Sequence, residues 1–310
     1  MAFAIVFPGQ GSQSVGMMAA YGDSPIVRAT FSEASDSLGR DLWQLASDGP
    51  AEALSQTVNT QPLMLTAGVA VYRLWLEKGG AIPTVVAGHS LGEYSALVAA
   101  GVLPLSMAVP LVELRAKAMQ EAVPPGTGAM AAILGLDADS IRLACAEAAQ
   151  GEVVEAVNFN SPEQTVIAGH ATAVQRAADA CKARGAKRAM LLPVSAPFHC
   201  SLMKPAAKRL AQRLAELDFS APAISVVNNV DVMIENDPNR IKDALIRQAA
   251  APVRWVEIMC KMQSMGIGHV LESGPGKVLA GVTKRCAEGM VGYGMADLAG
   301  LDAGLSAVQA

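Results

Sequence analysis

Short, uninterrupted apolar runs alternate along the chain with longer segments in which apolar residues recur at helical spacing. The first two runs, at residues 4–7 and 84–87, each lead into a glycine-containing loop. Such runs are typical of strands buried on both faces, as in a parallel sheet. The helical spacing predicts helices at residues 31–45, 66–77, 91–100 and 106–122. This alternation indicates an α/β fold.

Between residues 126 and 195 the predicted strands and helices are more closely spaced. The predicted order there is strand, helix, strand, strand, helix, strand, which is the ferredoxin-like pattern and takes about 70 residues. The strands are expected at residues 128–134, 153–158, 165–169 and 188–193, and the helices at 139–149 and 172–184. This segment has the size and pattern of a small α+β domain inserted into a larger one.

The larger pattern resumes after the insertion. Helices are expected at residues 201–217, at 240–249 and after residue 276, with strands at 224–227 and 269–272. We therefore predict an α/β domain of residues 1–125 and 196–310, interrupted by a smaller domain of residues 126–195. In the helix at 106–122, Ser106 is the expected N-cap, and Pro110 is expected to strain the first turn because proline lacks an N–H.

The composition indicates a globular protein with a large core. The 310 residues are 52% hydrophobic and only 17% charged, which disfavours disorder. The formal net charge is −4, so the chain has no general attraction for nucleic acid or for an anionic membrane. Aromatic residues, at 4%, are too few for base-stacking surfaces. Nucleic acid and membrane are thus excluded as default partners, and an enzyme is favoured.

The cysteines and the N-terminus predict a reducing, cytoplasmic setting. The five cysteines lie far apart without a CxxC pair, which excludes a disulfide framework and the usual zinc spacings. No basic stretch precedes a long apolar one at the N-terminus, so no signal peptide is expected. Residues 94–112 carry no charge, but their two prolines and one glycine favour two buried helices joined by a turn over a membrane span.

The clearest chemical signal is GHSLG at residues 88–92, a G-x-S-x-G motif at a predicted strand-to-helix junction. The glycines are needed there because neighbouring backbone comes too close for side chains, and the serine hydroxyl then projects above the sheet. The N–H of Leu91, at the start of the following helix, is placed to stabilise a developing oxyanion. An incidental serine in a glycine-rich turn is the alternative, but the context favours Ser90 as a nucleophile.

A serine nucleophile needs a base, and the chain has four histidines. His89 adjoins Ser90, so its side chain is expected to point away and to have a structural role. His170 is expected at the surface, and His269, which opens a strand, is typical of a sheet edge. His199 lies where the chain leaves the inserted segment, a place where loops often line clefts. Position alone leaves His199 open as the base.

A second unusual loop, FPGQGSQ at residues 7–13, follows the first predicted strand. Dinucleotide-binding loops are also glycine-rich, but Ser14 stands where the third glycine belongs, and no acidic residue ends a second strand. The other interpretation is a loop that presents backbone N–H groups, and the side-chain amide of Gln10 or Gln13, to an anion. The sequence favours this interpretation.

With five further motifs, these two loops give the chain a resemblance to a known family. In order, the motifs are FPGQGSQ (7–13), GHSLGE (88–93), LRAK with Arg115, NFNSP (158–162), PFH (197–199), Gln248 ahead of PVRW (252–255), and GPGK (274–277). Over essentially its whole length the chain resembles the malonyl-CoA:acyl carrier protein transacylases. The resemblance implies an α/β-hydrolase-like core with a ferredoxin-like insertion. It also implies cofactor-free transfer of a malonyl group to the phosphopantetheine thiol of acyl carrier protein, through a malonyl-serine ester, for fatty-acid elongation.

The resemblance further implies a role for each motif residue. Ser90 is the expected nucleophile and His199 its base, with the backbone carbonyl of Gln248 orienting the histidine in place of a carboxylate. The alanines that follow Gln248 provide little visible anchorage for that loop. Gln10 and the Leu91 N–H are expected to form the oxyanion hole. The implied substrate-binding residues are Arg115, Phe198, Asn160 and His89.

Arg115 is expected to bind the free carboxylate of the malonyl group. A guanidinium stays charged when buried and forks onto a carboxylate with two hydrogen bonds. From position alone, Glu113, Arg115 and Lys117 also fit a solvated helix face. Phe198 and Leu91 are expected to crowd a branched α-carbon and so to disfavour a methylmalonyl group.

Other functions share these motifs in whole or in part. A serine hydrolase or thioesterase shares the serine–histidine pair, but it usually has an acidic third member and has no need of Arg115. A trans-acting acyltransferase of polyketide synthesis or a malonate decarboxylase subunit has nearly the same motifs, and gene context or carrier preference would separate these. A non-catalytic acyl-carrier-binding scaffold is disfavoured by the intact Ser90, His199 and Gln10.

Acyl carrier proteins are acidic in general, so a basic docking surface is expected despite the net charge. The two candidate groups are Lys182, Arg184, Lys187 and Arg188, or Lys204, Lys208, Arg209 and Arg213. Solvated helix faces are the alternative for both groups. Nothing in the sequence requires more than a monomer. Cys200 is expected to be a small buried neighbour of His199 rather than a reactive thiol.

Overall fold

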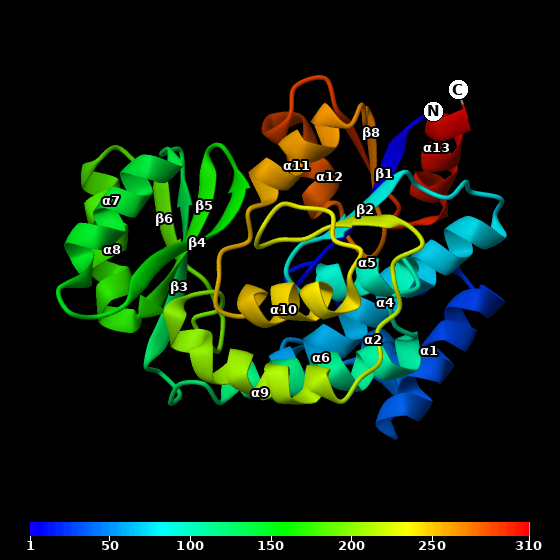
Figure 1. Ribbon diagram of the computed structural model, residues 1–310, viewed down its shortest axis with the longest axis horizontal. Helices are drawn as coiled ribbons and strands as arrows, with labels where there is room; N and C mark the ends of the chain where they lie inside the picture. The colour runs from blue at the N-terminus through cyan, green and yellow to red at the C-terminus, as the bar shows by residue number, and fades with distance from the viewer. Residues whose placement is uncertain (310) are drawn as a thin grey trace.

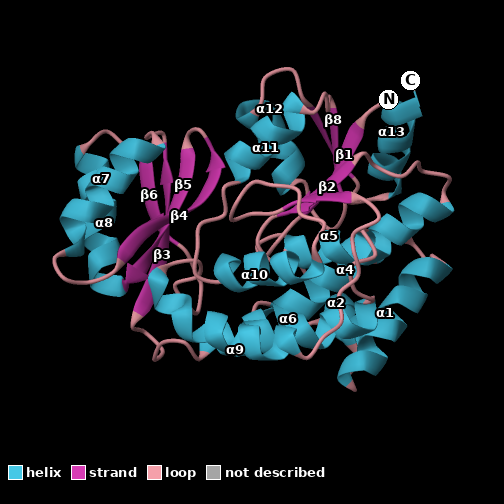
Figure 2. Ribbon diagram, viewed as in Figure 1, coloured by secondary structure: helices cyan, strands magenta, loops and turns pink. Residues whose placement is uncertain are grey.

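The computed structural model describes residues 1–309, which form two separate sheets, one parallel and one antiparallel (Figures 1 and 2). The parallel sheet has the strand order β7-β2-β1-β8-β9. Its strands are β1 (Phe3–Phe7), β2 (Val85–Gly88), β7 (Ser225–Val227), β8 (His269–Glu272) and β9 (Val291–Gly294). The fold is therefore a mixed α/β arrangement, as the alternating pattern predicts.

Helices pack on both faces of the parallel sheet because the side chains of its central strand alternate. Phe3, Ile5 and Phe7 belong to one apolar cluster, whereas Ala4 and Val6 belong to another. The first cluster includes residues of α1 (Pro25–Leu38), α2 (Leu42–Asp48), α3 (Ala51–Leu54), α4 (Thr57–Glu77), α5 (Gly92–Ala99), α6 (Leu105–Gln120), α9 (Lys204–Ala215), α10 (Pro238–Gln248) and α13 (Leu298–Gln309). The second includes residues of α11 (Trp255–Ser264) and α12 (Val278–Cys286).

The antiparallel sheet has the strand order β4-β5-β3-β6. Its elements follow the predicted sequence β3 (Gly128–Leu134), α7 (Ala138–Ala149), β4 (Val154–Ser161), β5 (Gln164–His170), α8 (Ala171–Ala183) and β6 (Arg188–Leu191). Both helices pack on one face. The other face packs against Cys200 and Phe198, where the chain returns to the larger part. Hydrogen bonds of Val253 with Val157 and Phe159 also link β4 to that part.

Two helix boundaries differ from the sequence prediction. One lies at a glycine that ends a helix, and the other lies ahead of a proline that does not interrupt its helix. The single helix predicted at residues 31–45 is two helices, since Gly39 adopts a left-handed φ of 66° that ends α1. The helix predicted to start at residue 66 starts at Thr57 and continues through Pro62. Most of α4 is buried, and tertiary packing outweighs the hydrogen bond that a proline removes.

The helix that carries Arg115 also differs from its prediction. α6 begins at Leu105, and its N-cap is Pro104 rather than Ser106. Pro110 lies inside α6 rather than in a strained first turn, and the helix continues through it to Gln120. The uncharged stretch at residues 94–112 is divided between α5 and α6, as predicted. Within residues 1–309, no helix is long and apolar enough to cross a membrane.

Candidate active site

The two motif loops meet at the carboxyl end of the parallel sheet, because β1 and β2 are neighbours in parallel register. Ser90 stands in the turn between β2 and α5 with a φ of 53°, a strained conformation for a serine. A Cβ on Gly88 would lie 1.8 Å from the carbonyl carbon of Gly92, and a Cβ on Gly92 would lie 2.0 Å from the carbonyl oxygen of Phe7. Close packing therefore requires both glycines, as the motif predicts.

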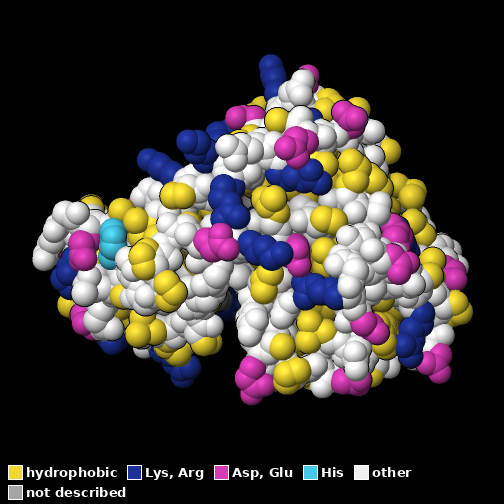
Figure 3. Space-filling model, turned by 90° about the horizontal axis from the view of Figure 1, so that it is seen from below, with side chains coloured by type: hydrophobic (Ala, Val, Ile, Leu, Met, Phe, Trp, Pro, Cys, Tyr) yellow, Lys and Arg dark blue, Asp and Glu magenta, His cyan; other side chains and the backbone are white. Residues whose placement is uncertain are grey.

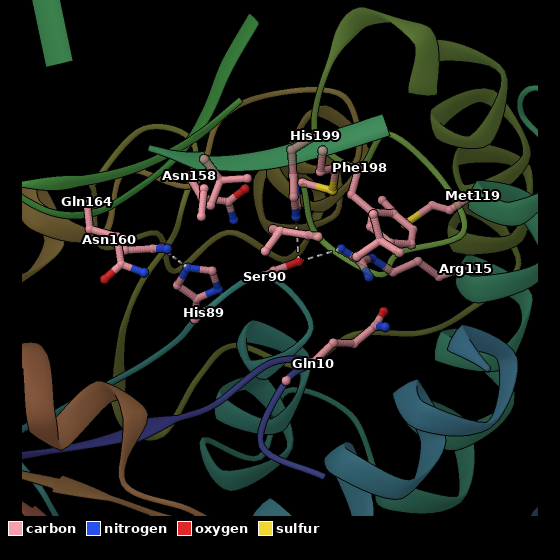
Figure 4. Close-up of a pocket in the computed structure, with 16 residues that line it drawn as sticks. Gln10, His89, Ser90, Arg115, Met119, Asn158, Asn160, Gln164, Phe198 and His199 are labelled. Carbon is pink, nitrogen blue, oxygen red and sulfur yellow. Dashed lines mark hydrogen bonds between the residues drawn. The ribbon is translucent and has the colours of Figure 1, made fainter. Parts of the chain in front are cut away.

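His199 and Ser90 line the same cavity, and their side chains are in direct contact (Figure 4). Nε2 of His199 lies 2.6 Å from Ser90 Oγ, and its Nδ1 lies 3.0 Å from the backbone oxygen of Gln248. A carbonyl oxygen only accepts hydrogen bonds, so Nδ1 carries the proton and Nε2 is free to accept the proton of Ser90. The structure thus brings together the three residues that the resemblance assigns to nucleophile, base and orienting carbonyl.

The surroundings of His199 predict an unusual pH profile. Burial and the nearby positive charge of Arg115 lower the pKa of His199 to about 3. An imidazole with so low a pKa stays unprotonated throughout the range from about pH 5 to about pH 8, so Nε2 keeps a free lone pair for the serine proton there. We expect the single-turnover rate of Ser90 acylation to show no acidic limb from His199 in that range. A limb at the ordinary histidine pKa, near about 6.5, would contradict this prediction.

The backbone N–H groups of Gln10, which lines the cavity with Ser90, and of Leu91, which follows Ser90, have no hydrogen-bond acceptor within residues 1–309. Leu91 N–H lies at the N-terminal end of α5, where helix N–H groups point at a bound anion. The side chain of Gln10 turns instead toward α4, where its Oε1 accepts a 2.6 Å hydrogen bond from Thr57. This geometry favours the backbone N–H of Gln10, not its side-chain amide, as the oxyanion donor.

Arg115 is buried, at 2% exposure, with its guanidinium next to the serine. Nη2 donates to Ser90 Oγ at 3.1 Å and to Gln248 Oε1 at 3.0 Å, while Nη1 donates to Gln61 Oε1 at 2.7 Å. All three acceptors are neutral. Burial lowers the pKa of Arg115, but a guanidinium remains charged even so. A buried cation that lines a cavity and has no carboxylate hydrogen-bonded to it within residues 1–309 is suited to an anionic group of a ligand, the role expected for Arg115.

The alternative of a solvated helix face holds for the two charged neighbours of Arg115 but not for Arg115 itself. Glu113 pairs with Lys117 at 2.8 Å and with Arg40 at 3.1 Å on the partly exposed side of α6. Arg115 lies on the opposite, buried side, because two positions along a helix are about 200° apart. The structure therefore places Arg115 inside the cavity.

Two side chains that the sequence does not single out hold the backbone of Ser90. Asn229 is fully buried, and its Oδ1 accepts a 2.7 Å hydrogen bond from Ser90 N–H. The Gln248 side chain donates from Nε2 to the Ser90 carbonyl oxygen at 3.0 Å. Gln248 was expected to act through its carbonyl alone, with little anchorage. Its own side chain provides the anchorage that the following alanines lack.

A cavity of about 340 Å³ opens above Ser90, between the two sheets. Its apolar wall comes largely from the antiparallel sheet and the returning chain, through Met130, Ala132, Val166, Leu192, Val194, Phe198 and, from α6, Met119. Phe198 lines the cavity as expected. Leu91 does not, because its side chain is only 1% exposed and packs in the main apolar cluster. The expectation that Leu91 crowds the substrate α-carbon is therefore wrong.

The polar side of the cavity contains His89 and two asparagines. His89 points away from Ser90, as expected, and its Nε2 lies 2.8 Å from Asn160 Oδ1 (Figure 4). Asn158 is only 7% exposed, and its Oδ1 has no hydrogen-bond partner within residues 1–309. Both asparagines line the cavity. A few polar groups in an otherwise apolar pocket fix the orientation of a ligand.

Most of the basic residues in the two candidate docking groups lie in ion pairs at the surface. Paired members of the two groups are Lys182, Arg184, Lys187, Arg209 and Arg213. The face that includes α9 shows basic side chains across its middle with acidic ones among them (Figure 3). Three members, Arg188, Lys204 and Lys208, have no ion-pair partner within residues 1–309. Of these, Arg188 opens the segment that leads to the cavity-lining Leu192.

Residues 4–290 match the family model described as acyl transferase domain. The chain belongs to this acyl transferase family. Its relatives include the malonyl CoA-acyl carrier protein transacylase of Escherichia coli (strain K12), which is 61% identical over 284 residues, 91% of this chain and 92% of the relative. The protein of the same name from Salmonella typhimurium is 57% identical over 305 residues, 98% of this chain and 99% of the relative. The family resemblance inferred from the seven motifs is confirmed.

Two solved structures extend the similarity to the fold. An acyl-carrier-protein S-malonyltransferase from Burkholderia pseudomallei has a TM-score of 0.97 and 59% identity, with 99% of this chain and 100% of that chain covered. A malonyl-transacylase in complex with a type II polyketide synthase acyl-carrier protein has a TM-score of 0.97 and 55% identity, with the same coverage. The arrangement of both sheets is therefore shared with malonyl-transferring relatives.

Proposed function

We propose that this chain transfers the malonyl group of malonyl-CoA to the phosphopantetheine thiol of acyl carrier protein and thereby supplies fatty-acid elongation. The names of its relatives support this function. The observation that carries it is the buried cation Arg115, which lies 3.1 Å from Ser90 Oγ and whose hydrogen-bond acceptors within residues 1–309 are all neutral. A malonyl group pairs an anionic carboxylate with a reactive carbonyl. The site offers a guanidinium to the first and a serine to the second.

The first half-reaction forms a malonyl-serine ester. Ser90 Oγ attacks the thioester carbonyl while His199 Nε2 takes its proton, and the tetrahedral oxyanion is stabilised by the N–H groups of Gln10 and Leu91. The C–S bond then breaks, and the protonated imidazole gives its proton to the departing CoA thiolate. The Gln248 carbonyl keeps Nδ1–H in place throughout. Every chemical role belongs to a side chain or backbone group of this chain, so the proposal involves no cofactor.

The second half-reaction repeats these steps with a new thiol. The phosphopantetheine thiol of the carrier gives its proton to His199 and attacks the ester, and Ser90 leaves with that proton restored. An ester between two thioesters differs modestly in energy from both, so the exchange is reversible. Asn160, His89 and Asn158 are proposed to orient the substrate at the polar side of the cavity. Phe198 and Met119 are proposed to limit the group on the malonyl α-carbon.

We further propose the division into a catalytic domain of residues 1–125 and 196–310 and an inserted domain of residues 126–195. The order β4-β5-β3-β6 with both helices on one face supports a ferredoxin-like interpretation of the inserted domain. The five parallel strands support an α/β-hydrolase-like interpretation of the rest. The carrier protein is proposed to dock on the side of Arg188, because the chain runs from there directly to the cavity wall.

Intact-mass measurement tests the transferase function against a hydrolase. The protein is mixed with malonyl-CoA and then with phosphopantetheinylated acyl carrier protein. We expect a malonyl adduct that persists in buffer and moves to the carrier. An adduct that clears equally fast in buffer alone makes water the acceptor and favours a hydrolase or thioesterase. The absence of any adduct would remove the transferase proposal.

A further inference from the structure

Ser90 is held in its strained conformation at both of its backbone polar groups. Its N–H donates to Asn229 Oδ1 at 2.7 Å, and its carbonyl accepts from Gln248 Nε2 at 3.0 Å. The Asn229 amide is itself fixed, because its Nδ2 donates to the Gly88 carbonyl at 2.7 Å. A positive φ at a non-glycine residue persists only where surrounding contacts over-determine it. The two amide side chains provide these contacts.

Both of these contacts depend on one carboxylate oxygen. Oε2 of Glu93 accepts a 2.9 Å hydrogen bond from the backbone N–H of Asn229 and a 3.0 Å hydrogen bond from Gln248 Nε2. Glu93 is 2% exposed and lies in the first turn of α5, directly after the nucleophile turn. It therefore joins the 228–230 loop and the end of α10 to the helix that Ser90 precedes.

Glu93 also sets the orientation of the Gln248 amide. The amide lies between a carboxylate and a guanidinium, since Nε2 donates to Glu93 and Oε1 accepts from Arg115 Nη2 at 3.0 Å. A carboxylate only accepts and a guanidinium only donates, so a single amide orientation satisfies both. The backbone carbonyl of the same residue accepts from His199 Nδ1. Displacement of Gln248 would thus affect the base as well as the nucleophile.

We propose that Glu93 is a positioning residue that, through Asn229 and Gln248, holds Ser90 and His199 in reactive alignment. This inference rests on the proposed role of Ser90 as the nucleophile. Burying a carboxylate is costly, and burial raises the pKa of Glu93 to about 7 even though Gln248, Asn229 and Arg115 act in the opposite direction. An apolar residue at this position would avoid that cost. The hydrogen-bond geometry explains why the residue here is acidic, because Oε2 accepts from both Asn229 and Gln248.

The test measures the reactivity of Ser90 toward methanesulfonyl fluoride, which forms a serine sulfonate with loss of fluoride. The probe has no carboxylate, so its reaction is independent of malonyl recognition by Arg115. We expect Glu93→Ala to lower the sulfonylation rate about 10²-fold, because misplacement by about 1 Å has an effect of this size. Glu93→Gln is expected to recover the rate to within about tenfold of wild type, since an amide oxygen still accepts both N–H groups.

Glu272→Ala is the matched control. Glu272 is also a fully buried carboxylate whose pKa burial raises to about 7, but it accepts from Ala280 N–H near the start of α12. Within the described residues it has no hydrogen bond to Ser90, His199, Asn229 or Gln248. Its sulfonylation rate is expected to stay within about threefold of wild type. Hydrogen exchange of residues 88–92 provides a second readout, expected to be faster in Glu93→Ala than in Glu272→Ala.

Three outcomes would overturn the inference. They are a sulfonylation rate of Glu93→Ala within threefold of wild type, a loss of reactivity in the control as large as that in Glu93→Ala, and no reaction of the wild type with the probe. Failure of the malonyl-transfer proposal has a different signature. In that case the wild type reacts with methanesulfonyl fluoride but forms no adduct with malonyl-CoA.

Discussion

Replacement of Ser90 by alanine is expected to abolish the malonyl adduct and to slow malonyl transfer by at least about 10³-fold. Ser90 Oγ is the group of this chain that accepts the malonyl group in the proposed scheme, and it lies 2.6 Å from the base and 3.1 Å from Arg115 Nη2. Without it, the cavity keeps its cation and its oxyanion donors but no group to hold the acyl chain. Intact mass measures the adduct, and single-turnover assays with labelled malonyl-CoA measure the transfer.

Ser95→Ala is the matched control for this variant. Ser95 lies on α5 and is 1% exposed, and its hydroxyl has no hydrogen-bond partner within residues 1–309. Its replacement is expected to leave the adduct and the transfer rate unchanged. Persistence of the adduct in Ser90→Ala would mean that another nucleophile carries it. Cys200 is a poor candidate, since burial raises its thiol pKa to about 12 and its thiol donates a hydrogen bond to the Pro197 carbonyl oxygen.

The parallel sheet could be predicted wherever its strands are fully buried. β1 and β2 have unbroken apolar runs, and burial on both faces leaves no other pattern available. β9 was missed because VGYG combines two glycines with an exposed valine, which gives little apolar signal. The prediction that His269 lies at a sheet edge is wrong, because its strand β8 lies between β1 and β9. β9 pairs with β8, and the His269 ring stacks on Tyr293 with centroids 5.7 Å apart.

The C-terminal helix was missed for a related reason. α13 contains Gly300 and Gly304, and glycine weakens the helix signal in a sequence. The structure requires Gly300 for close backbone packing, and Gly304 also packs closely against a side chain. A Cβ on Gly300 would lie 2.2 Å from the Gly294 carbonyl oxygen, and a Cβ on Gly304 would lie 3.0 Å from a Leu271 methyl carbon. In α13, the residues that lower the helix propensity are therefore the ones that allow close tertiary packing.

The site separates into a part visible in the sequence and a part that only the fold creates. Ser90 could be predicted because its turn is local, with glycines at fixed spacing. His199 needed the family resemblance, since 109 residues separate it from Ser90. Asn229 has no local signature, because an isolated polar residue looks the same whether it is solvated or buried against a turn 139 residues away. Glu93 closes the GHSLGE motif, but the motif does not show that its carboxylate contacts Asn229 and Gln248. Their contribution arises from contacts, not from motifs.

Arg115→Ala is expected to lower kcat/KM for malonyl-CoA by about 10²- to 10³-fold, because the variant removes a buried, charge-assisted pair with the substrate carboxylate. It should affect acetyl-CoA far less, since an acetyl group has no carboxylate to pair. The preference for malonyl over acetyl is therefore the sharpest readout. Steady-state assays with both thioesters measure it. A hydrolase without need of an acidic acyl group would show no such change in preference.

Arg115→Lys and Arg40→Ala separate recognition from folding. Lysine keeps the charge but loses the planar fork, so a loss of about 10- to 10²-fold is expected, between wild type and alanine. Arg40 forms an ion pair with Glu113, which lies on the same helix as Arg115, but Arg40 is outside the cavity. Its replacement should leave the preference for malonyl over acetyl unchanged. Equal losses for both thioesters in Arg115→Ala would instead assign Arg115 a structural role, through its hydrogen bonds to Gln61 and Gln248. A loss confined to malonyl-CoA would show that the Arg115 guanidinium binds the carboxylate of the malonyl group.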